Sequence, residues 1–422
     1  MDATSAYNEL ISATRDIALL RSIESVLGWD ERVMMPDKGA EHRANQMSLL
    51  ARLTHDQFTS PRVGELIARV EGTDLVSDPE SDAAVNVREL RRSYDRATKV
   101  PTKLVEELTK VGVLGQQAWV EARKKSDFPT FRPWLERIVD LKRQESAWLA
   151  VSNMPAVDQL QGRPIGRVLT KMGKVTREQV VEGLTLQKSK GGMLGEILVR
   201  LGYVSRADVE VALAGQLGKA TARVGHPYDP LLDEYEPGDT TADIRAVFEA
   251  LRAPLVDLVG RMAQSGKRAP VDLFERDYPA DAQQQFARDA AAKVGFDFTG
   301  GRLDVSVHPF CTELGPGDVR MTTRYNEGRF GAFFGVLHET GHGLYGQGLD
   351  KQHYGTPRGQ YISLGIHESQ SRLYENFVGR SRSFWQFFYP GAQQAFPDAL
   401  RDVSMDQWLF ANNDVRPRFI RV

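Results

Sequence analysis

The 422-residue sequence contains a single cysteine, Cys311, and no apolar run that approaches the roughly 18 residues of a membrane span. One thiol excludes an intramolecular disulfide and suits a reducing compartment. Residues 1–5 lack the basic-then-apolar pattern of a secretory signal, so we expect a cytoplasmic protein without a membrane partner. The formal net charge of −2 argues against nucleic acid as the main partner.

Histidine is also scarce, yet two of the 8 histidines stand four residues apart in the motif His338-Glu339-Thr340-Gly341-His342. On a helix these two share a face, so His338 and His342 can bind one zinc ion. Glu339 is rotated by roughly 100° from His338 and would reach a metal-bound water. Zinc lowers the pKa of that water to about 7, where a carboxylate can take its proton. The motif predicts metal-assisted hydrolysis with Glu339 as the general base.

Four glycines within and after the motif are unfavourable in a helix, where each costs up to about 1 kcal/mol against alanine. We expect them either to let another segment approach closely or to end the helix. Residues 330–337, just before the motif, carry no charge and predict a buried helix. The glycines are Gly341, Gly343, Gly346 and Gly348.

A catalytic zinc site needs a third protein ligand and one open position. The best candidates lie on a downstream segment with helical spacing, for which Ser363 is the expected cap. A carboxylate on this second helix would complete a His-His-Glu set. Spacing alone does not choose between His367, Glu368 and Glu375.

The motif at 338–342 and the stretch His367-Glu368-Ser369-Gln370 together resemble the M32 metallocarboxypeptidases, the thermostable carboxypeptidase family. Five further stretches also resemble the family, and the resemblance covers nearly the whole chain apart from one internal segment. They are Gly28-Trp29-Asp30, Tyr94-Asp95-Arg96-Ala97, Gly225-His226-Pro227-Tyr228-Asp229, His308-Pro309-Phe310 and Asp318-Val319-Arg320-Met321-Thr322-Thr323-Arg324-Tyr325.

The resemblance implies a zinc-dependent enzyme that hydrolyses C-terminal amino acids from peptides with a free C-terminus. His338, His342 and Glu368 would be the metal ligands, and Glu339 would activate water. The family also implies Co²⁺ as a substitute metal and a homodimer as the assembly.

Substrate-binding candidates follow from the same motifs. His308 and Asp318 would line the groove, although His308 also fits a structural histidine and Asp318 a turn cap. Asp318 would otherwise accept a hydrogen bond from a ligand histidine. Arg320 and Arg324 suit a two-pronged contact with the terminal carboxylate of a peptide, or a structural ion pair. Arg421 is a further family candidate for that carboxylate.

Residues 419–422 match the start of a family motif whose remainder is absent, so the resemblance implies a C-terminally truncated member. Part of the substrate cleft would then be lacking, and apolar helix faces would be exposed. The alternative function is therefore a catalytically impaired homologue. In it, an inserted repeat would act as a binding module for a cyclic dinucleotide or a protein partner.

That repeat occupies residues 151–220, which interrupt the family pattern between an N-terminal helical part, 1–150, and a zinc-binding part, 221–422. Residues 165–187 align with residues 194–216 at a constant offset of 29, with eight identical pairs. Each copy predicts a short helix, a glycine turn, a cap and a second helix. The insertion should form a small helical domain.

The repeat resembles the N-terminal domain of type II secretion and type IV pilus assembly ATPases. Some members of that family bind cyclic di-GMP through two such motifs. The arginine that opens each motif there is replaced here by Pro164 and Met193, which removes a strong charged contact. We therefore favour a docking module over a cyclic di-GMP site at the insert.

Periodicity predicts a mainly α fold. The resemblance implies that it is the fold of a helical zincin-like metallopeptidase, with a few short strands by the active-site groove. The expected strands are Leu303–His308 and Val319–Tyr325, directly before the motif helix, where they would pair with an extended peptide. The expected helices cover residues 5–28, 40–53, 80–98, 101–124, 130–149, 241–264 and 280–294.

Overall fold

The computed structural model describes residues 1–150, 163–172, 174–204, 206, 208, 209, 212, 213, 226–325 and 330–415. The chain divides into two compact units. The larger unit contains Met1–Lys142, Glu234–Pro237 and Ala250–Val422, and the smaller contains Arg143–Asp233 and Gly238–Glu249. Each unit buries apolar side chains of its own and is described by itself.

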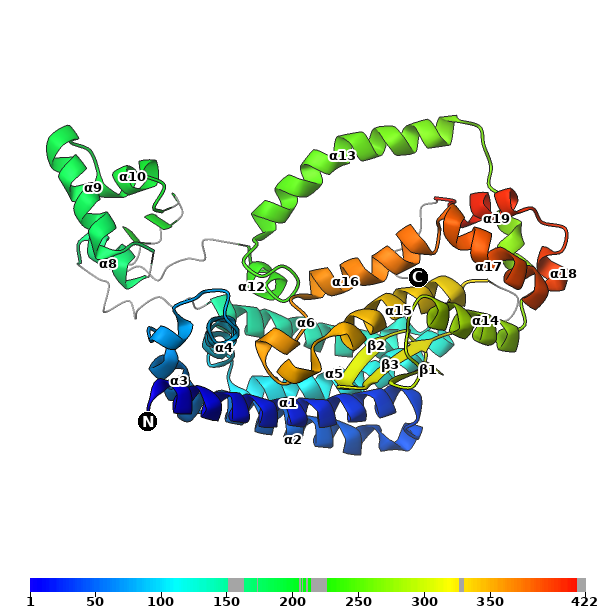
Figure 1. Ribbon diagram of the computed structural model, residues 1–422, viewed down its shortest axis with the longest axis horizontal. Helices are drawn as coiled ribbons and strands as arrows, with labels where there is room; N and C mark the ends of the chain where they lie inside the picture. The colour runs from blue at the N-terminus through cyan, green and yellow to red at the C-terminus, as the bar shows by residue number, and fades with distance from the viewer. Residues whose placement is uncertain are drawn as a thin grey trace. The chain divides into compact units, whose positions relative to one another are not determined.

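Helices make up most of the described chain, which confirms the predicted mainly α fold (Figure 1). All seven helices expected from periodicity are present, with ends that differ by five residues or fewer. The α-helices are α1 (Ala3–Val33), α2 (Ala40–Phe58), α3 (Pro61–Val70), α4 (Asp82–Ala97), α5 (Thr102–Lys125), α6 (Phe128–Ala150), α8 (Ile165–Lys171), α9 (Arg177–Lys190), α10 (Leu194–Arg200), α12 (Asp229–Leu232), α13 (Thr241–Gln264), α14 (Ala280–Lys293), α15 (Ala332–Gly348), α16 (Leu364–Arg372), α17 (Arg382–Ala395), α18 (Pro397–Leu400) and α19 (Met405–Asn412). Short 3₁₀ turns cover Asp37–Gly39, Asp74–Val76, Val271–Glu275, Lys351–His353 and Pro357–Gly359, and the π-helix η6 covers Leu373–Val378.

Three short strands form one sheet in the larger unit. They are β1 (Gly301–Val305), β2 (Cys311–Gly315) and β3 (Asp318–Thr323), in the spatial order β1-β3-β2. The central strand β3 pairs in parallel with β1 and antiparallel with β2. The sheet lies against the helix that carries the H-E-x-x-H motif, as the sequence predicts.

Both predicted strands end earlier than expected, at Val305 and at Thr323, and a third strand was not predicted. The strand expected at Leu303–His308 ends at Val305, because its last paired residue on β3 is Thr323. Strand β2 was not predicted, since its five residues show neither alternation nor high strand propensity. It forms because β3 supplies backbone partners along its length.

An aromatic core holds the start of α15. Phe330 and Phe333 stack with ring centroids 5.4 Å apart, and Phe333 stacks on Phe286 of α14 at 5.2 Å. Trp385 of α17 and Trp408 of α19 are fully buried, with centroids 5.1 Å apart. Buried aromatic rings contribute large apolar areas to folding. The apolar run before the motif is therefore buried, as predicted, and it fixes the direction in which α15 leaves the core.

Helix α1 lies along the outer strand of the sheet. The Ser22 hydroxyl donates a hydrogen bond to the backbone carbonyl of Leu314 in β2, and Arg15 donates one to the backbone carbonyl of Tyr354. A separate apolar core with α3 and α4 buries Leu10 and Ile17 of α1. The N-terminal helix thereby reaches the neighbourhood of residues more than 290 positions away.

The internal repeat is visible as two equivalent packing arrangements in the smaller unit. A Cβ on Gly166 would lie 2.7 Å from Val180, and a Cβ on Gly195 would lie 2.7 Å from Val209. Leu169 and Leu198 are both completely buried in the same small core. Each pair of partners is displaced by the same 29 positions. Glycine suits both positions because a Cβ there would overlap a valine side chain.

Helix α13 buries none of its residues and exposes eight large apolar side chains along its length. No helix in the described parts of the chain combines the length and the apolarity needed to cross a bilayer. Helix α13 adds nothing to the cores of the fold. The exposed side chains are Val247, Phe248, Leu251, Leu255, Val256, Leu258, Val259 and Met262.

The glycines of α15 serve both of the expected purposes. A Cβ on Gly341 would lie 2.6 Å from the Ser371 Cα and still nearer to the Gln370 carbonyl oxygen, so α16 crosses α15 at backbone contact. A Cβ on Gly343 would meet Phe296 at 2.6 Å, and one on Gly346 would meet Glu313 at 2.5 Å. Gly348 faces open space and ends the helix.

We expect Gly341→Ala to reduce the free energy of unfolding by about 1–3 kcal/mol, because the new methyl group overlaps the backbone of α16. Chemical denaturation measures this loss. Gly348→Ala is the matched control on the same helix, where a Cβ meets nothing within 4 Å and alanine favours the helix. Equal stability of the two variants would contradict the crossing described above.

Candidate metal centre and its cavity

Helix α15 carries His338 and His342 on one face, and α16 brings Glu368 opposite them. The ligand atoms of these three side chains all lie within 4.8 Å of one another. One Glu368 oxygen is 3.6 Å from His338 Nε2 and 3.9 Å from His342 Nε2. Atoms that share a tetrahedral zinc ion at about 2.1 Å lie roughly 3.4 Å apart. The three residues therefore fit a divalent cation with little movement.

The other two ligand candidates lie behind the histidines. Glu375, in the π-helix η6, is 2.9 Å from His338 Nδ1, and His367 Nδ1 is 2.6 Å from His342 Nδ1. These contacts leave both Nε2 atoms directed at Glu368. The structure thus separates three candidates that spacing alone did not distinguish, and it places Glu368 in the cluster.

Local sequence explains the position of Glu368. The Ser363 side chain accepts a hydrogen bond from the Ile366 backbone N–H at 3.1 Å, which caps α16 as predicted. Ser371 then donates to a Glu368 carboxylate oxygen at 2.9 Å. The cap and this hydrogen bond hold the carboxylate toward α15.

Folding keeps His342 of α15 neutral and Glu368 of α16 ionised. Burial, with help from neighbouring His367 and His338, lowers the pKa of His342 to about 4. Burial alone would raise the pKa of Glu368, but the hydrogen bond from Ser371 and the nearby histidines outweigh it and lower that pKa. The site therefore pairs a neutral His342 imidazole with an ionised Glu368 carboxylate, the protonation states that metal ligands require.

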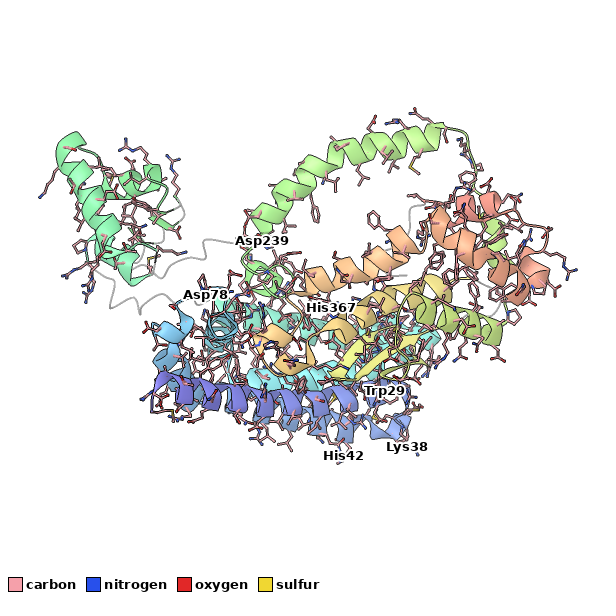
Figure 2. The ribbon with its side chains drawn as sticks, in the orientation of Figure 1. Trp29, Lys38, His42, Asp78, Asp239 and His367 are labelled. Atoms are coloured by element: carbon pink, nitrogen blue, oxygen red, sulfur yellow. The ribbon has the colours of Figure 1, made fainter. Side chains whose placement is uncertain are left out.

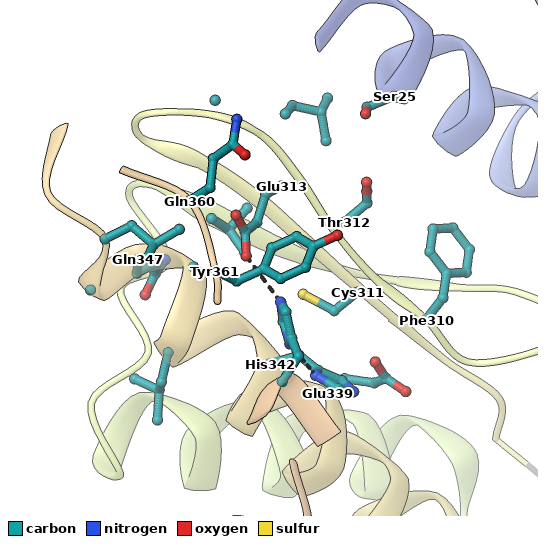
Figure 3. A pocket seen from close by; sticks show the side chains of 18 of the residues that line it. Ser25, Phe310, Cys311, Thr312, Glu313, Glu339, His342, Gln347, Gln360 and Tyr361 are labelled. Atoms are coloured by element: carbon teal, nitrogen blue, oxygen red, sulfur yellow. Dashed lines mark hydrogen bonds and ion pairs between the residues drawn. The ribbon is translucent and has the colours of Figure 1, made fainter. Parts of the chain in front are cut away.

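A cavity of about 1400 Å³ opens onto this cluster, within the larger unit. Its lining includes Arg21 and Ser25 of α1, the residues of β2, the histidines of α15 and Tyr361 before α16 (Figure 3). Pockets for small ligands typically measure about 300–1000 Å³, so this cavity suits an extended molecule such as a peptide.

Glu339 lines the cavity and is 5% exposed. Cys311 of β2 lies in the same lining (Figure 3). Burial raises the pKa of the Cys311 thiol well above its usual value, and the Glu339 and Glu313 carboxylates add to this effect. Cys311 is therefore a neutral wall residue beside a carboxylate.

The predicted substrate residues fall into three groups. His308 and Arg324 line the cavity, and Arg324 donates to the Val307 carbonyl at 3.3 Å. Asp318 and Arg320 are outside the lining and form a two-pronged ion pair with each other, at 2.7 and 2.8 Å. Arg421 lies outside the described residues.

Asp318 does not contact the histidines of the cluster in the way suggested for it. The Nδ1 atom of His338 contacts Glu375, and that of His342 contacts His367. Its partner Arg320 stacks over Trp29 of α1, which Figure 2 labels, with the guanidinium carbon 4.4 Å from the ring centroid. The pair joins the sheet to α1.

Sequence reasoning missed several residues of the site. Arg21 and Arg123 reach the cavity from α1 and α5, and Glu313 and Tyr361 reach it from β2 and the loop before α16. None of these residues belongs to a recognisable local motif. One signal was present: Gly346 indicated that some segment approaches α15, and that segment carries Glu313.

An H-E-x-x-H helix that faces a glutamate on a second helix beside a large cavity defines a metallopeptidase. Within that class, the chain belongs to the family described as Carboxypeptidase Taq (M32) metallopeptidase, which it matches over residues 9–162 and 208–422. The enzyme class is therefore metallocarboxypeptidase, as the sequence predicts.

Similar proteins agree with this assignment. Thermostable carboxypeptidase 1 of Thermus thermophilus is 40% identical over 423 residues, which cover 100% of this chain and 70% of that protein. Carboxypeptidase 1 of Bacillus subtilis is 30% identical over 423 residues, with the same coverage. The solved M32 carboxypeptidase from Deinococcus radiodurans is 30% identical with a TM-score of 0.69, and the match covers 96% of this chain and 67% of that chain.

The lowered pKa of His342 predicts a pH dependence of stability in the metal-free protein. Between about 6.5 and about 4 the unfolded chain binds a proton that the folded chain does not, so stability is lost as pH falls through this window. Above about 6.5 the contribution is constant. The loss should reach on the order of 3 kcal/mol, measured by urea unfolding.

His342→Asn should remove this part of the pH dependence, since it removes the titrating group. His42→Asn, at an exposed position on α2, is the control and should keep it. An unaltered pH dependence in His342→Asn would show that the imidazole is not held neutral by folding.

Proposed function

We propose that the chain is a zinc-dependent carboxypeptidase that releases C-terminal amino acids from peptides by Glu339-assisted attack of water. One observation carries the proposal. His338, His342 and Glu368 form a cluster in the lining of a cavity large enough for a peptide, and Glu339 lines the same cavity. The names of the similar proteins support the same activity.

His338, His342 and Glu368 would hold the cation. Two imidazoles and one carboxylate are a donor set that suits Zn²⁺, with Co²⁺ as a substitute. A bound divalent cation would supply Lewis acidity, which polarises a peptide carbonyl and acidifies a coordinated water. Glu375 accepts a hydrogen bond from His338 Nδ1 and so keeps the Nε2 lone pair available to the ion.

Glu339 would act as the general base and then as the general acid. It follows His338 on α15, so its carboxylate projects into the cavity beside the ligands rather than among them. There it can take a proton from water and return it to the leaving amine. Cys311 beside it is neutral, because burial raises the pKa of its thiol, and therefore does not compete as a base.

A carboxypeptidase must also capture the terminal carboxylate of its substrate. Arg324 is the best candidate, because it lines the cavity and donates a hydrogen bond to a neutral backbone carbonyl, whereas Arg320 donates to a carboxylate. Arg320 already pairs with Asp318. A free carboxylate would therefore gain more from Arg324, and His308 on the same wall would help to shape that end of the cavity.

Glu339→Gln should abolish turnover of an amino-blocked dipeptide while stoichiometric zinc binding persists, because the amide cannot take a proton. Amino-acid release measures turnover, and metal analysis of the purified protein measures binding. His338→Ala should instead lose the metal. Turnover by Glu339→Gln at a wild-type rate would refute the assigned base, and zinc-loaded wild type without turnover would refute the proposed activity.

Arg324→Ala should raise KM for a peptide with a free C-terminus by about tenfold or more, because one charge-assisted hydrogen bond is worth about 1.5–3 kcal/mol. Binding of the corresponding C-terminal amide should change little, so the preference for acid over amide should fall. The control Arg320→Ala should keep that preference. If Arg324→Ala keeps it as well, another residue holds the carboxylate.

We further propose that residues 151–220 are an inserted module between the parts 1–150 and 221–422. The unmatched gap at 163–207 in the family match and the separate small core support an insertion. The likeness of this module to secretion ATPases stays a prediction, as does a docking role or cyclic di-GMP binding. For the whole protein, a homodimer and a cytoplasmic location also stay predictions.

A further inference from the structure

Three side chains from three elements form a chain of contacts that ends on one metal-site histidine. His342 Nδ1 on α15 is 2.6 Å from His367 Nδ1 on α16. His367 Nε2 is in turn 3.3 Å from a carboxylate oxygen of Glu313 on β2. Figure 3 shows Glu313, Tyr361 and His342 around this end of the cavity.

Once His342 Nε2 must face a cation, hydrogen bonding between neutral rings allows one arrangement of protons along this chain. If His342 offers its Nε2 lone pair toward Glu368 and a shared cation, its proton is on Nδ1. His367 must then accept at Nδ1 and carry its own proton on Nε2, where it needs an acceptor. The Glu313 carboxylate is that acceptor, and it cannot donate when ionised.

The surroundings hold the chain in place. The His367 ring lies between Tyr345 and Tyr361, with centroids 5.1 and 5.0 Å away in edge-on contacts. Gly346 leaves room for Glu313, since a Cβ there would lie 2.5 Å from the carboxylate oxygen. Among the described residues, Glu313 forms an ion pair with His367.

We propose that Glu313 and His367 are positioning residues that hold His342 in the Nδ1–H tautomer and aim its Nε2 at the metal site. His338 achieves the same through direct contact with Glu375. The inference rests on the proposed metal site, and it assigns the wall strand β2 a second task beside lining the cavity. Outer partners of this kind typically change metal affinity by about 10–100-fold.

The first experiment reads the tautomers directly by ¹⁵N NMR of histidine-labelled, metal-free protein at mildly alkaline pH. Wild type should show His342 protonated on Nδ1 and His367 on Nε2. Glu313→Leu should convert His367 to a mixture of tautomers, whereas the isosteric Glu313→Gln keeps an acceptor and should preserve them. Unchanged tautomers in Glu313→Leu would overturn the proposal without any need for bound metal.

The second experiment measures zinc affinity by competition with a chelator. Glu313→Leu and His367→Leu should each lose about 10–100-fold, and Glu313→Gln should lose less. The double variant should bind no worse than His367→Leu, because Glu313 acts through His367. Asp304→Asn, which removes a carboxylate that pairs with Arg302 on β1, is the control and should bind like wild type.

Additive losses in the double variant, or wild-type affinity in Glu313→Leu, would contradict a positioning chain. The Co²⁺-substituted proteins give a further distinction, since a role limited to fold stability would leave the d–d spectrum unchanged. Both measurements are independent of turnover. An enzyme that positions His342 in this way but hydrolyses no peptide would refute the proposed function and leave this inference standing.

Discussion

The site depends on one backbone contact, the crossing of α15 and α16 at Gly341. Without a side chain at this position, the two helices approach closely enough for a glutamate on one to face two histidines on the other. The hydrogen bonds behind the two histidines also depend on that spacing, because Glu375 and His367 come from the same segment as Glu368. Apolar packing fixes α15 from one end, and the crossing fixes its partner.

The residues of the candidate metal site could be proposed from the sequence because most of them belong to local patterns. His338, Glu339 and His342 follow from helical spacing. Ser363 predicted the start of the second helix, because a serine cap bonds a backbone N–H only three residues away. The mainly α fold could be predicted from periodicity, because the spacing of apolar residues on a helix is also a local pattern. The glycines of α15 indicated close approach, although they did not reveal which segment would come near.

The features that could not be predicted depend on contacts between segments distant in sequence. Strand β2 has no strand signal of its own and exists through pairing with β3, so Glu313 had no predicted position. Helical spacing left both Glu368 and Glu375 open, because that choice depends on the crossing geometry; the family resemblance, and not spacing, selected Glu368. Asp318 and Arg320 carry suitable charges for the groove, but they neutralise each other in a pair that stacks on α1.

The hydrogen bond from Ser22 to Leu314 joins residues 292 positions apart, whereas His338 and Glu375 are 37 positions apart. Closing a long loop costs more chain entropy than closing a short one, so the contact between α1 and β2 is entropically the more costly of the two to form. The ligand cluster can assemble from a contiguous stretch near the end of the described chain. The cavity wall also includes α1, which the ribosome makes first, so completing it requires contacts across most of the chain.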